Sequence, residues 1–398
     1  MAGPLSGIRV LELAGIGPGP FCAMMLADMG ADVLRVDRPD PVDLGLPLDP
    51  KFDVIARGRR SIALDLKDAR AIEIALALVE KADVLIEGFR PGVTERLGLS
   101  PDACLARNPR LVYGRVTGWG QDGPMAQAAG HDINYIAIAG ALNAIGPAER
   151  PAPPLNLIGD YGGGGMYLAF GIVCALCERH SSGRGQVIDA AMSEGAASLM
   201  SIFYGRMAAR LWHDKRGVNI LDGGAPWYNV YETADGKYVA IGAIEHRFYA
   251  NLMKELGLDT PTLPQQYDRT RWPELRANLA RVFKQKTRDE WCEALAGHDV
   301  CIAPVLSLAE ASSHPHNRAR NAFLQSDGVL QPGPAPRFSR TPGRIERGAP
   351  RRGEGGAAAL ADWGFDAQQI ADFRRSGCQM SDVRDQMSEV RSESARNE

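Results

Sequence analysis

The sequence has no long hydrophobic run and no large excess of charge of one sign. Its most apolar helical stretch, residues 166–177, is 12 residues long, well short of the ~20 residues that cross a bilayer. The 45 Lys and Arg residues nearly balance the 48 Asp and Glu residues, which leaves a formal net charge of −3. No overall basicity attracts the chain to nucleic acid or to an anionic membrane, so we expect neither as a partner.

Cysteine is scarce, and no secretory signal is visible at the start of the sequence. The seven cysteines are an odd number at irregular spacing, which is typical of reduced thiols. Cys174 and Cys177 form a C-x-x-C inside an apolar helical stretch, where packing is favoured over a metal or redox site. The opening MAGPLSGIRVLEL has no basic region, and the ending ARNE is not a peroxisomal address. We therefore expect a cytoplasmic protein.

Glycine and proline, by contrast, are abundant. They account for 44 and 26 of the 398 residues, about 18% together, against roughly 12% in an average protein. The chain is long enough for two or three domains at roughly 150 residues each. Its 45% hydrophobic and 23% charged residues are ordinary for a globular protein.

The first 120 residues alternate between short β-branched runs and amphipathic helical segments, which predicts an α/β fold with a parallel sheet covered by helices. We expect strands over residues 8–14, 31–37, 61–67, 83–89 and 111–117, and helices over residues 21–29 and from a cap at Asp68. Two long, largely buried helices are expected over residues 162–179 and 193–211.

The pattern changes at Trp227, where two strand-like runs are joined by the hairpin signal ADGK. Helical segments follow, and the glycine content falls. We predict four parts: a large domain over residues 1–224, a smaller α+β domain over 225–326, a C-terminal segment over 327–377 that returns to the large domain, and a disordered tail over 378–398.

The first glycine cluster, GIGPGP at residues 15–20, lies between an expected strand and an expected helix. With Asp37 about 20 residues later, it imitates a dinucleotide-binding fingerprint, but Pro20 and Phe21 stand where the third glycine should be. A tight strand-to-helix turn is the simpler interpretation. A further alternative is that Arg38 contacts a phosphate rather than a ribose hydroxyl.

The second cluster, GDYGGGG at residues 159–165, precedes an apolar helix. Four consecutive glycines cost backbone entropy, so a ligand or another backbone should come close to them. Their amides would lie at a helix start, where negative charge is stabilised. For Asp160 itself, helix N-capping is the alternative interpretation. A third cluster, DGGAP at residues 222–226, is expected to act as a hinge.

Two further polar residues stand out, although neither carries an argument alone. His131 opens a weakly polar helix in the run GHDINY, where a capping or packing role is the simpler interpretation. Glu245 ends an expected strand in the run GAIEH, where a solvated charge is usual.

Together, these segments resemble the α-methylacyl-CoA racemases, a group within the family III CoA-transferases. The resemblance extends over about residues 4–343. It is carried by PLSGIRVLELAGIGPGPFCAMMLADMGADVLRVDRP, SIALDLK, DVLIEGFRPGVTERLGL, TGWGQDGPMAQAAGHDINYIA, PPLNLIGDYGGGGM, GRGQVIDAAM, LDGGAPWYNVYETADGKYVAIGAIE and PAPRFSRTPG.

The resemblance implies a Rossmann-like large domain and a smaller α+β domain, in two chains that interlock as a homodimer. It also implies an acyl-CoA substrate, and chemistry that needs no cofactor and no metal. By resemblance, His131 and Asp160 are the two acid/base groups, Glu245 orients His131, and Asn156 holds the Asp160 carboxyl. Amides near Gly162–Gly165 are expected to bind the enolate oxygen.

Positions that match the family's contacts to CoA are expected to bind the substrate here. Arginines among them suit the phosphates, and backbone groups suit the adenine and the pantetheine amides. These residues are Arg38, Leu64, Asp65, Leu66, Lys67, Gly88, Phe89, Arg90, Arg96, Gly130, Asp132, Ile133, Asn134 and Tyr135.

Two other functions stay open at the level of sequence. A CoA-transferase of the same fold would use Asp160 as a nucleophile and carry a mixed anhydride, and it would not need His131 and Glu245 as a pair. A non-catalytic CoA-binding module would need none of the three. The presence of all three residues favours the racemase.

Overall fold

The computed structural model describes residues 3–40 and 48–380. Its internal contacts divide it into two units. Unit 1 comprises Met1–Ala139, Leu155–Leu199 and Asn321–Glu398, and unit 2 comprises Gly140–Pro154 and Met200–Arg320.

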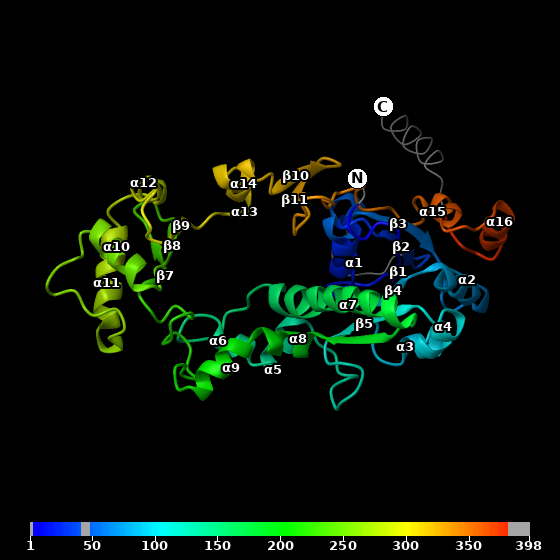
Figure 1. Cartoon of the computed structure of the whole chain (residues 1–398), viewed down its shortest axis with the longest axis horizontal. Helices are drawn as coiled ribbons and strands as arrows, with labels where there is room; N and C mark the ends of the chain where they lie inside the picture. The colour runs from blue at the N-terminus through cyan, green and yellow to red at the C-terminus, as the bar shows by residue number, and fades with distance from the viewer. Residues whose placement is uncertain (1–2, 41–47, 381–398) are drawn as a thin grey trace. The chain divides into compact units, whose positions relative to one another are not determined.

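A six-stranded parallel sheet forms the centre of unit 1 (Figure 1). Its order is β3-β2-β1-β4-β5-β6, and every neighbouring pair is parallel. This is the order of a doubly wound fold, in which the chain reverses direction across the sheet between β1 and β4. The strands are β1 (Arg9–Leu13), β2 (Asp32–Asp37), β3 (Arg59–Ala63), β4 (Val84–Glu87), β5 (Val112–Thr117) and β6 (Val187–Ala191).

Helices cover both faces of this sheet, and a two-stranded hairpin precedes the last two of these helices, α15 and α16, in the chain. The helices are α1 (Pro18–Asp28), α2 (Ala69–Lys81), α3 (Val93–Leu97), α4 (Pro101–Arg107), α5 (Asp132–Ile138), the π-helix η3 (Leu157–Met166), α7 (Tyr167–Ser182), α8 (Met192–Leu199), α15 (Gly356–Asp362) and α16 (Ala367–Arg375), with 3-10 turns η1 (Pro50–Phe52) and η2 (Val54–Ala56). The hairpin pairs β10 (Phe323–Ser326) with β11 (Val329–Pro332).

Alternating side chains of the strands fill two separate cores. Leu11 and Leu34 face α2 and α15, while their chain neighbours Val10 and Val33 face α1 and α7. This alternation follows from the two-residue period of a strand, and burial on both faces explains why apolar residues stand at consecutive positions in β1, β2 and β4.

The structure corrects three details of the expected large domain. The strand expected over residues 61–67 ends at Ala63, because the chain turns at Asp65 and Asp68 into α2. The sequence pattern did not reveal β6. The helix expected over residues 162–179 is divided between η3 and α7, and the helix expected over residues 193–211 is divided between α8 and a separate helix of unit 2. Neither is as buried as expected, since Phe170 of α7 is 70% exposed and Ile202 is 53% exposed.

The tail predicted over residues 378–398 is wrong at its start. Cys378 is buried in the core, and Gln379 exchanges two backbone hydrogen bonds with Ala63, at 2.8 and 2.9 Å. The chain there adds to the edge of the sheet beside β3. Residues 381–398 of the predicted tail lie outside the described residues.

Unit 2 is built around a three-stranded antiparallel sheet in the order β7-β8-β9. Trp227, Leu252 and Phe283 are fully buried in its core. Its elements are α6 (Ala141–Ala144), α9 (Ser201–Ala208), β7 (Tyr228–Glu232), β8 (Tyr238–Gly242), α10 (His246–Glu255), η4 (Arg269–Arg271), α11 (Trp272–Phe283), α12 (Arg288–Ala294), β9 (Ile302–Pro304), α13 (Leu308–Ala311) and α14 (Pro315–Ala319).

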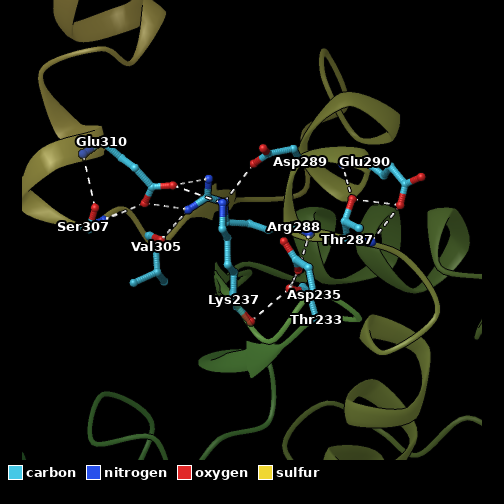
Figure 2. A network of polar contacts seen from close by, with 10 residues as sticks. All are labelled: Thr233, Asp235, Lys237, Thr287, Arg288, Asp289, Glu290, Val305, Ser307 and Glu310. Atoms are coloured by element: carbon cyan, nitrogen blue, oxygen red, sulfur yellow. Dashed lines mark hydrogen bonds and ion pairs between the residues drawn. The ribbon is translucent and has the colours of Figure 1, made fainter.

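A polar network centred on Arg288 ties the segment after β9 to α12 (Figure 2). The Arg288 guanidinium donates to both carboxylate oxygens of Glu310, at 2.9 and 3.0 Å, and to the carbonyl of Val305 at 3.1 Å. This guanidinium holds the pKa of Glu310 well below its usual range. The network explains why a stretch with little regular structure keeps a defined path.

Unit 2 also extends beyond the limits predicted for the small domain, residues 225–326. It includes α6 and α9, because the chain segment before β7 packs on residues 140–154. Arg216 donates to the carbonyls of Asn143 and Pro147, at 2.6 and 2.7 Å. Residues 321–326, in contrast, belong to unit 1 through the hairpin β10-β11.

Candidate active site

The candidate site lies where the strand order of the sheet reverses. The loops that follow β1 and β4 diverge there, which leaves a crevice at the carboxyl ends of these strands. The first loop contains Gly15–Gly17 and the second contains Gly88–Arg90. Residues of both loops line cavities, so the GIGPGP cluster and the GFR run are neighbours in space.

Two buried ion pairs hold these loops. Arg59 of β3 pairs with Glu12 of β1 at 2.5 Å, and it also donates to the carbonyl of Pro20 at the start of α1. Arg115 of β5 pairs with Glu87 of β4 at 2.7 Å, and the second oxygen of Glu87 accepts the amide of Phe89 at 2.7 Å. Each pair lies beneath one loop. The loops can therefore present backbone groups at fixed positions.

A cavity of about 380 Å³ at this place, which we call the His–Asp cavity, contains both predicted acid/base residues. His131 comes from the start of α5, and Asp160 comes from the first turn of η3. The other walls come from both loops and from α8. The cavity is lined by Ile16, Gly17, Pro18, Gly88, Phe89, Arg90, Pro91, Val116, Thr117, Gly118, Trp119, Ala126, Ala128, Ala129, Gly130, His131, Tyr135, Asn156, Asp160, Tyr161 and Met192.

The glycine run shapes η3 because other backbones touch it. A Cβ atom on Gly163 would lie 2.6 Å from the amide nitrogen of Ala196 in α8, and one on Gly165 would lie 2.9 Å from the carbonyl oxygen of Pro18 in α1. Of the two interpretations left open by the sequence, close approach of another backbone therefore accounts for these glycines. The packing fixes the helix that carries Asp160.

Asp160 is half-buried and has defined neighbours. Its carboxylate accepts a hydrogen bond from the Asn156 side chain at 3.1 Å, and its amide donates to the carboxylate of Asp132 at 2.7 Å. A Cβ atom on Gly17 would lie 3.2 Å from the Asp160 carboxylate. Burial raises the pKa of Asp160, an effect that the Asn156 hydrogen bond and His131 oppose and the Asp132 charge reinforces.

His131 is held differently. It is the N-cap residue of α5, with extended backbone angles, and its amide donates to the Asn134 side chain at 3.1 Å. Its side chain is exposed. His131 is therefore held by the capping contacts at the start of α5, in contrast to the half-buried Asp160.

The expected role of the glycine amides needs correction. Gly162–Gly165 lie inside η3 rather than at a helix start, since η3 begins at Leu157. In a π-helix each amide is directed at the carbonyl five residues earlier, so these amides do not point into the His–Asp cavity. Asp160 is not the N-cap residue either, because Asn156 has that position.

Two further cavities adjoin the first, and Phe89 lines all three. The larger, which we call the Leu64 cavity, has a volume of about 620 Å³ and contains six predicted CoA contacts: Arg38, Leu64, Asp65, Leu66, Lys67 and Phe89. The other, the Gly15 cavity, has about 380 Å³ and also contains Arg38, together with Arg35 and Arg352.

Several predicted substrate contacts lie elsewhere. Arg96 of α3 lines none of the three cavities. The Asp132 side chain is buried behind Asp160, Ile133 is exposed, and Asn134 caps α5. Of the run GHDINY, the structure thus brings Gly130, His131 and Tyr135 to the His–Asp cavity.

Glu245 belongs to unit 2, as the N-cap residue of α10 directly after β8. Its carboxylate is exposed and has no hydrogen-bond partner among the described residues. Its action on His131 stays a prediction.

Sequence reasoning missed residues that the fold brings to the site. Gly17 has a positive φ of 69° and faces Asp160, and Tyr161 stacks on Phe21 with ring centroids 4.6 Å apart. The carboxylate of Asp132 reaches the Asp160 amide across 28 residues of chain, so no local pattern announces this contact. No sequence motif pointed to three further residues that line the cavities, Trp119, Met192 and Arg352.

Over residues 3–40 and 48–380, no three His, Cys, Asp or Glu side chains are grouped to hold a metal ion. Nor does any helix in the described ranges have the length and apolarity needed to cross a membrane. All seven cysteines are unpaired, and Cys174 and Cys177 are exposed on α7 rather than packed, contrary to expectation.

Comparison with known proteins agrees with the geometry. The chain is 48% identical to alpha-methylacyl-CoA racemase of Mus musculus over 369 residues, covering 92% of this chain and 95% of that protein. It is 46% identical to alpha-methylacyl-CoA racemase of Homo sapiens over 371 residues, with the same two shares covered.

A solved structure of a CAIB/BAIF family protein from Brucella suis has the same architecture. Its TM-score is 0.80 at 27% sequence identity, and the match covers 91% of this chain and all of that one. The model of CoA-transferase family III matches residues 5–355. This chain therefore belongs to CoA-transferase family III.

Proposed function

We propose that the protein is an α-methylacyl-CoA racemase, an isomerase that interconverts the (2R) and (2S) forms of 2-methylacyl-CoA thioesters. The observation that carries this proposal is the His–Asp cavity, in which an imidazole and a carboxyl with a raised pKa lie at the reversal point of a parallel sheet. The names of relatives at 46–48% identity support it.

The reaction needs two groups that exchange protons with opposite faces of one carbon. One of them, as a base, takes the α-proton, and the C–H electron pair moves into an enolate. The other then delivers its proton to the opposite face of the α-carbon, which restores the thioester. His131 and Asp160 exchange these roles for the two directions, and no redox change or cofactor is required.

The protonation states fit the two directions of this cycle. A carboxyl that must donate a proton near neutral pH needs a pKa above its ordinary value. Burial in the His–Asp cavity raises the pKa of Asp160. Asn156 keeps the ionised form accessible by donating to it. We propose that Glu245 favours the imidazolium form of His131.

CoA would extend from the His–Asp cavity past Phe89 into the two adjoining cavities. Arg90 lines the first cavity, and Arg38 and Lys67 line the Leu64 cavity. These three cations suit the phosphates, while Leu64 and Leu66 supply an apolar wall for the adenine. This placement keeps the thioester between His131 and Asp160.

We propose that the active enzyme is an interlocked homodimer. In unit 1 an apolar face remains exposed on η3 and α7, where Met166 is 53% and Phe170 is 70% exposed, and Tyr167 and Val173 lie beside them. Apolar patches of this kind mark interaction sites. The exposed side chains of Glu245 and His131 fit a site that a second chain completes. With seven unpaired cysteines, we expect the dimer to work in the cytoplasm.

The deciding experiment is incubation of a single-epimer 2-methylacyl-CoA in D₂O. We expect deuterium at the α-carbon and formation of the other epimer. The transferase alternative predicts no exchange and movement of CoA to an added free acid, through an anhydride at Asp160. That outcome would refute the racemase proposal.

A further inference from the structure

Unit 2 contains a cavity of about 370 Å³ between α11 and the chain segment that precedes β7. The size falls within the range of about 300–1,000 Å³ that is usual for small-molecule sites. Every residue that lines it belongs to unit 2. The lining comprises His213, Lys215, Gly217, Val218, Gly224, Arg269, Trp272, Pro273 and Arg276.

The polar part of this lining is basic. Lys215, Arg269 and Arg276 are joined by His213, and no carboxylate lines the cavity. None of the three cationic side chains forms an ion pair in the described part of the chain. Arg276 donates to the carbonyls of Gly223 and Gly224, yet its Nε atom is buried and has no hydrogen-bond partner. A buried donor without a partner costs free energy unless a ligand or solvent satisfies it.

Two acidic side chains near the lining residues, Asp222 and Glu274, are engaged elsewhere. The Asp222 carboxylate accepts from the amides of Asn219 and Gly224, at 2.8 and 2.9 Å, and from the Asn219 side chain at 2.8 Å. Glu274 accepts two hydrogen bonds from Arg271, at 2.7 and 2.8 Å. Asp268, next to Arg269, caps η4 by accepting the Thr270 amide at 3.1 Å. Asp214, next to Lys215, is exposed and does not line the cavity. Among the described residues, no carboxylate therefore forms an ion pair with the three cations.

From these contacts we infer that the cavity binds a small organic phosphate, with the phosphate on Lys215, Arg269 and Arg276. Guanidinium groups and phosphates make charge-assisted, often bidentate hydrogen bonds. Val218, Trp272 and Pro273 give the ligand an apolar wall, and the Arg269 guanidinium lies 5.4 Å from the centre of the Trp272 ring. The ligand thus carries an aromatic or apolar group beside its phosphate.

A bound phosphate would connect α11 to the segment before β7. Arg269 and Arg276 belong to η4 and α11, whereas Lys215 and Gly217 belong to the segment. Arg276 already makes a polar connection of this kind, through two glycine carbonyls. We therefore expect the ligand to stabilise unit 2 against unfolding.

Protection of Lys215 from acetylation tests the site on the intact chain. The full-length protein is treated with a limiting acetylating reagent, with and without ADP or inorganic pyrophosphate, and the rate at each lysine is followed by mass spectrometry. We expect saturating ADP to slow Lys215 at least 10-fold and to leave Lys254, an exposed lysine of α10, unchanged. Because of the apolar wall, ADP should protect at a concentration about 10-fold below that of pyrophosphate, one decade of affinity being about 1.4 kcal/mol.

Matched variants separate this site from the substrate groove. Arg269→Ala should abolish protection of Lys215, whereas Arg281→Ala, on α11 but outside the cavity, and Arg38→Ala, in unit 1, should preserve it. Circular dichroism shows whether each variant remains folded. Equal slowing of Lys215 and Lys254, or protection that persists in Arg269→Ala, would overturn the inference, and so would equal protection by ADP and pyrophosphate. None of these readouts depends on racemase activity.

Discussion

The two sides of the His–Asp cavity are built in different ways. Asp160 lies on a helix whose glycines pack directly on neighbouring backbones, and its carboxyl and amide both have partners within unit 1. His131 is exposed at the start of a seven-residue helix, where its amide donates to the Asn134 side chain. The two predicted acid/base groups therefore differ in burial and packing. In the proposed dimer, Glu245 of the second chain would act on the His131 side.

The largest expected effect is on the chemistry itself. Asp160→Asn and His131→Ala should each slow epimerisation by about 10²–10⁴-fold, while binding of the CoA thioester persists. In D₂O each variant should still exchange the α-proton of one epimer, because the remaining base faces one side of the carbon. The two variants should exchange opposite epimers.

Loss of exchange from both epimers in either variant would mean that the two sides do not act independently. Loss of thioester binding would make the altered residue structural. Isothermal titration with an unreactive acyl-CoA ether measures the binding.

Gly163→Ala tests the rigid side through packing. The new Cβ atom would lie 2.6 Å from the amide nitrogen of Ala196 and 2.9 Å from the carbonyl oxygen of Met192, so backbone must move. We expect a loss of about 2–3 kcal/mol in the free energy of unfolding, measured by urea denaturation.

Gly205→Ala in α9 is the matched control, since nothing lies within 4 Å of the Cβ atom it adds. This change should be neutral or stabilise the chain by up to about 1 kcal/mol. Equal effects of the two alanines would show that η3 is not held by its glycines.

Asn156→Ala removes the hydrogen bond that lowers the pKa of Asp160. We expect a loss of about 10-fold in kcat. The acidic limb of the profile of kcat/KM against pH should move to higher pH, for the direction in which Asp160 is the base.

Asn134→Ala is the counterpart on the other side, because it removes the acceptor of the His131 amide. It should not shift the acidic limb of the profile of kcat/KM against pH, which we assign to Asp160. A shift of similar size in both variants would contradict the assignment of that limb to Asp160.

The smallest expected effect is on the way that thermal stability depends on pH. Burial raises the pKa of Asp160 above its value in the unfolded chain, so its ionised form opposes folding, and the cost appears as the pH rises above about 4. Asp160→Asn should therefore raise Tm at pH 7 by about 1–3 °C, with the gain vanishing near pH 4. His131→Ala, at an exposed side chain, should leave Tm within about 1 °C. A lower Tm for Asp160→Asn at pH 7 would contradict the origin of the raised pKa in burial.

The sequence was sufficient for elements whose signal is local. Short β-branched runs located β1, β2, β4 and β5, and Asp68 does cap α2 by accepting the Arg70 amide at 2.9 Å. Strand β6 escaped because it forms the sheet edge, where Val187 is 40% exposed and the apolar run is short.

The site was predictable only as a set of residues. The motifs named His131, Asp160 and Asn156, but no spacing shows that Asp132 accepts the Asp160 amide or that Gly17 faces its carboxylate. These contacts join segments far apart in the chain. The four glycines at residues 162–165 illustrate the same limit. The sequence predicted that a ligand or another backbone comes close to them, and it did not show which of the two.

The π-helical form of η3 makes the length of this segment as important as its composition. Between Leu157 and Met166 the chain carries an extra residue in each turn relative to an α-helix. Deleting one residue between Asp160 and Gly163 would rotate the Asp160 carboxyl about the helix axis relative to the glycines that pack on α1 and α8. The number of residues in this segment therefore decides which side of η3 carries the carboxyl, independently of the side chains around it.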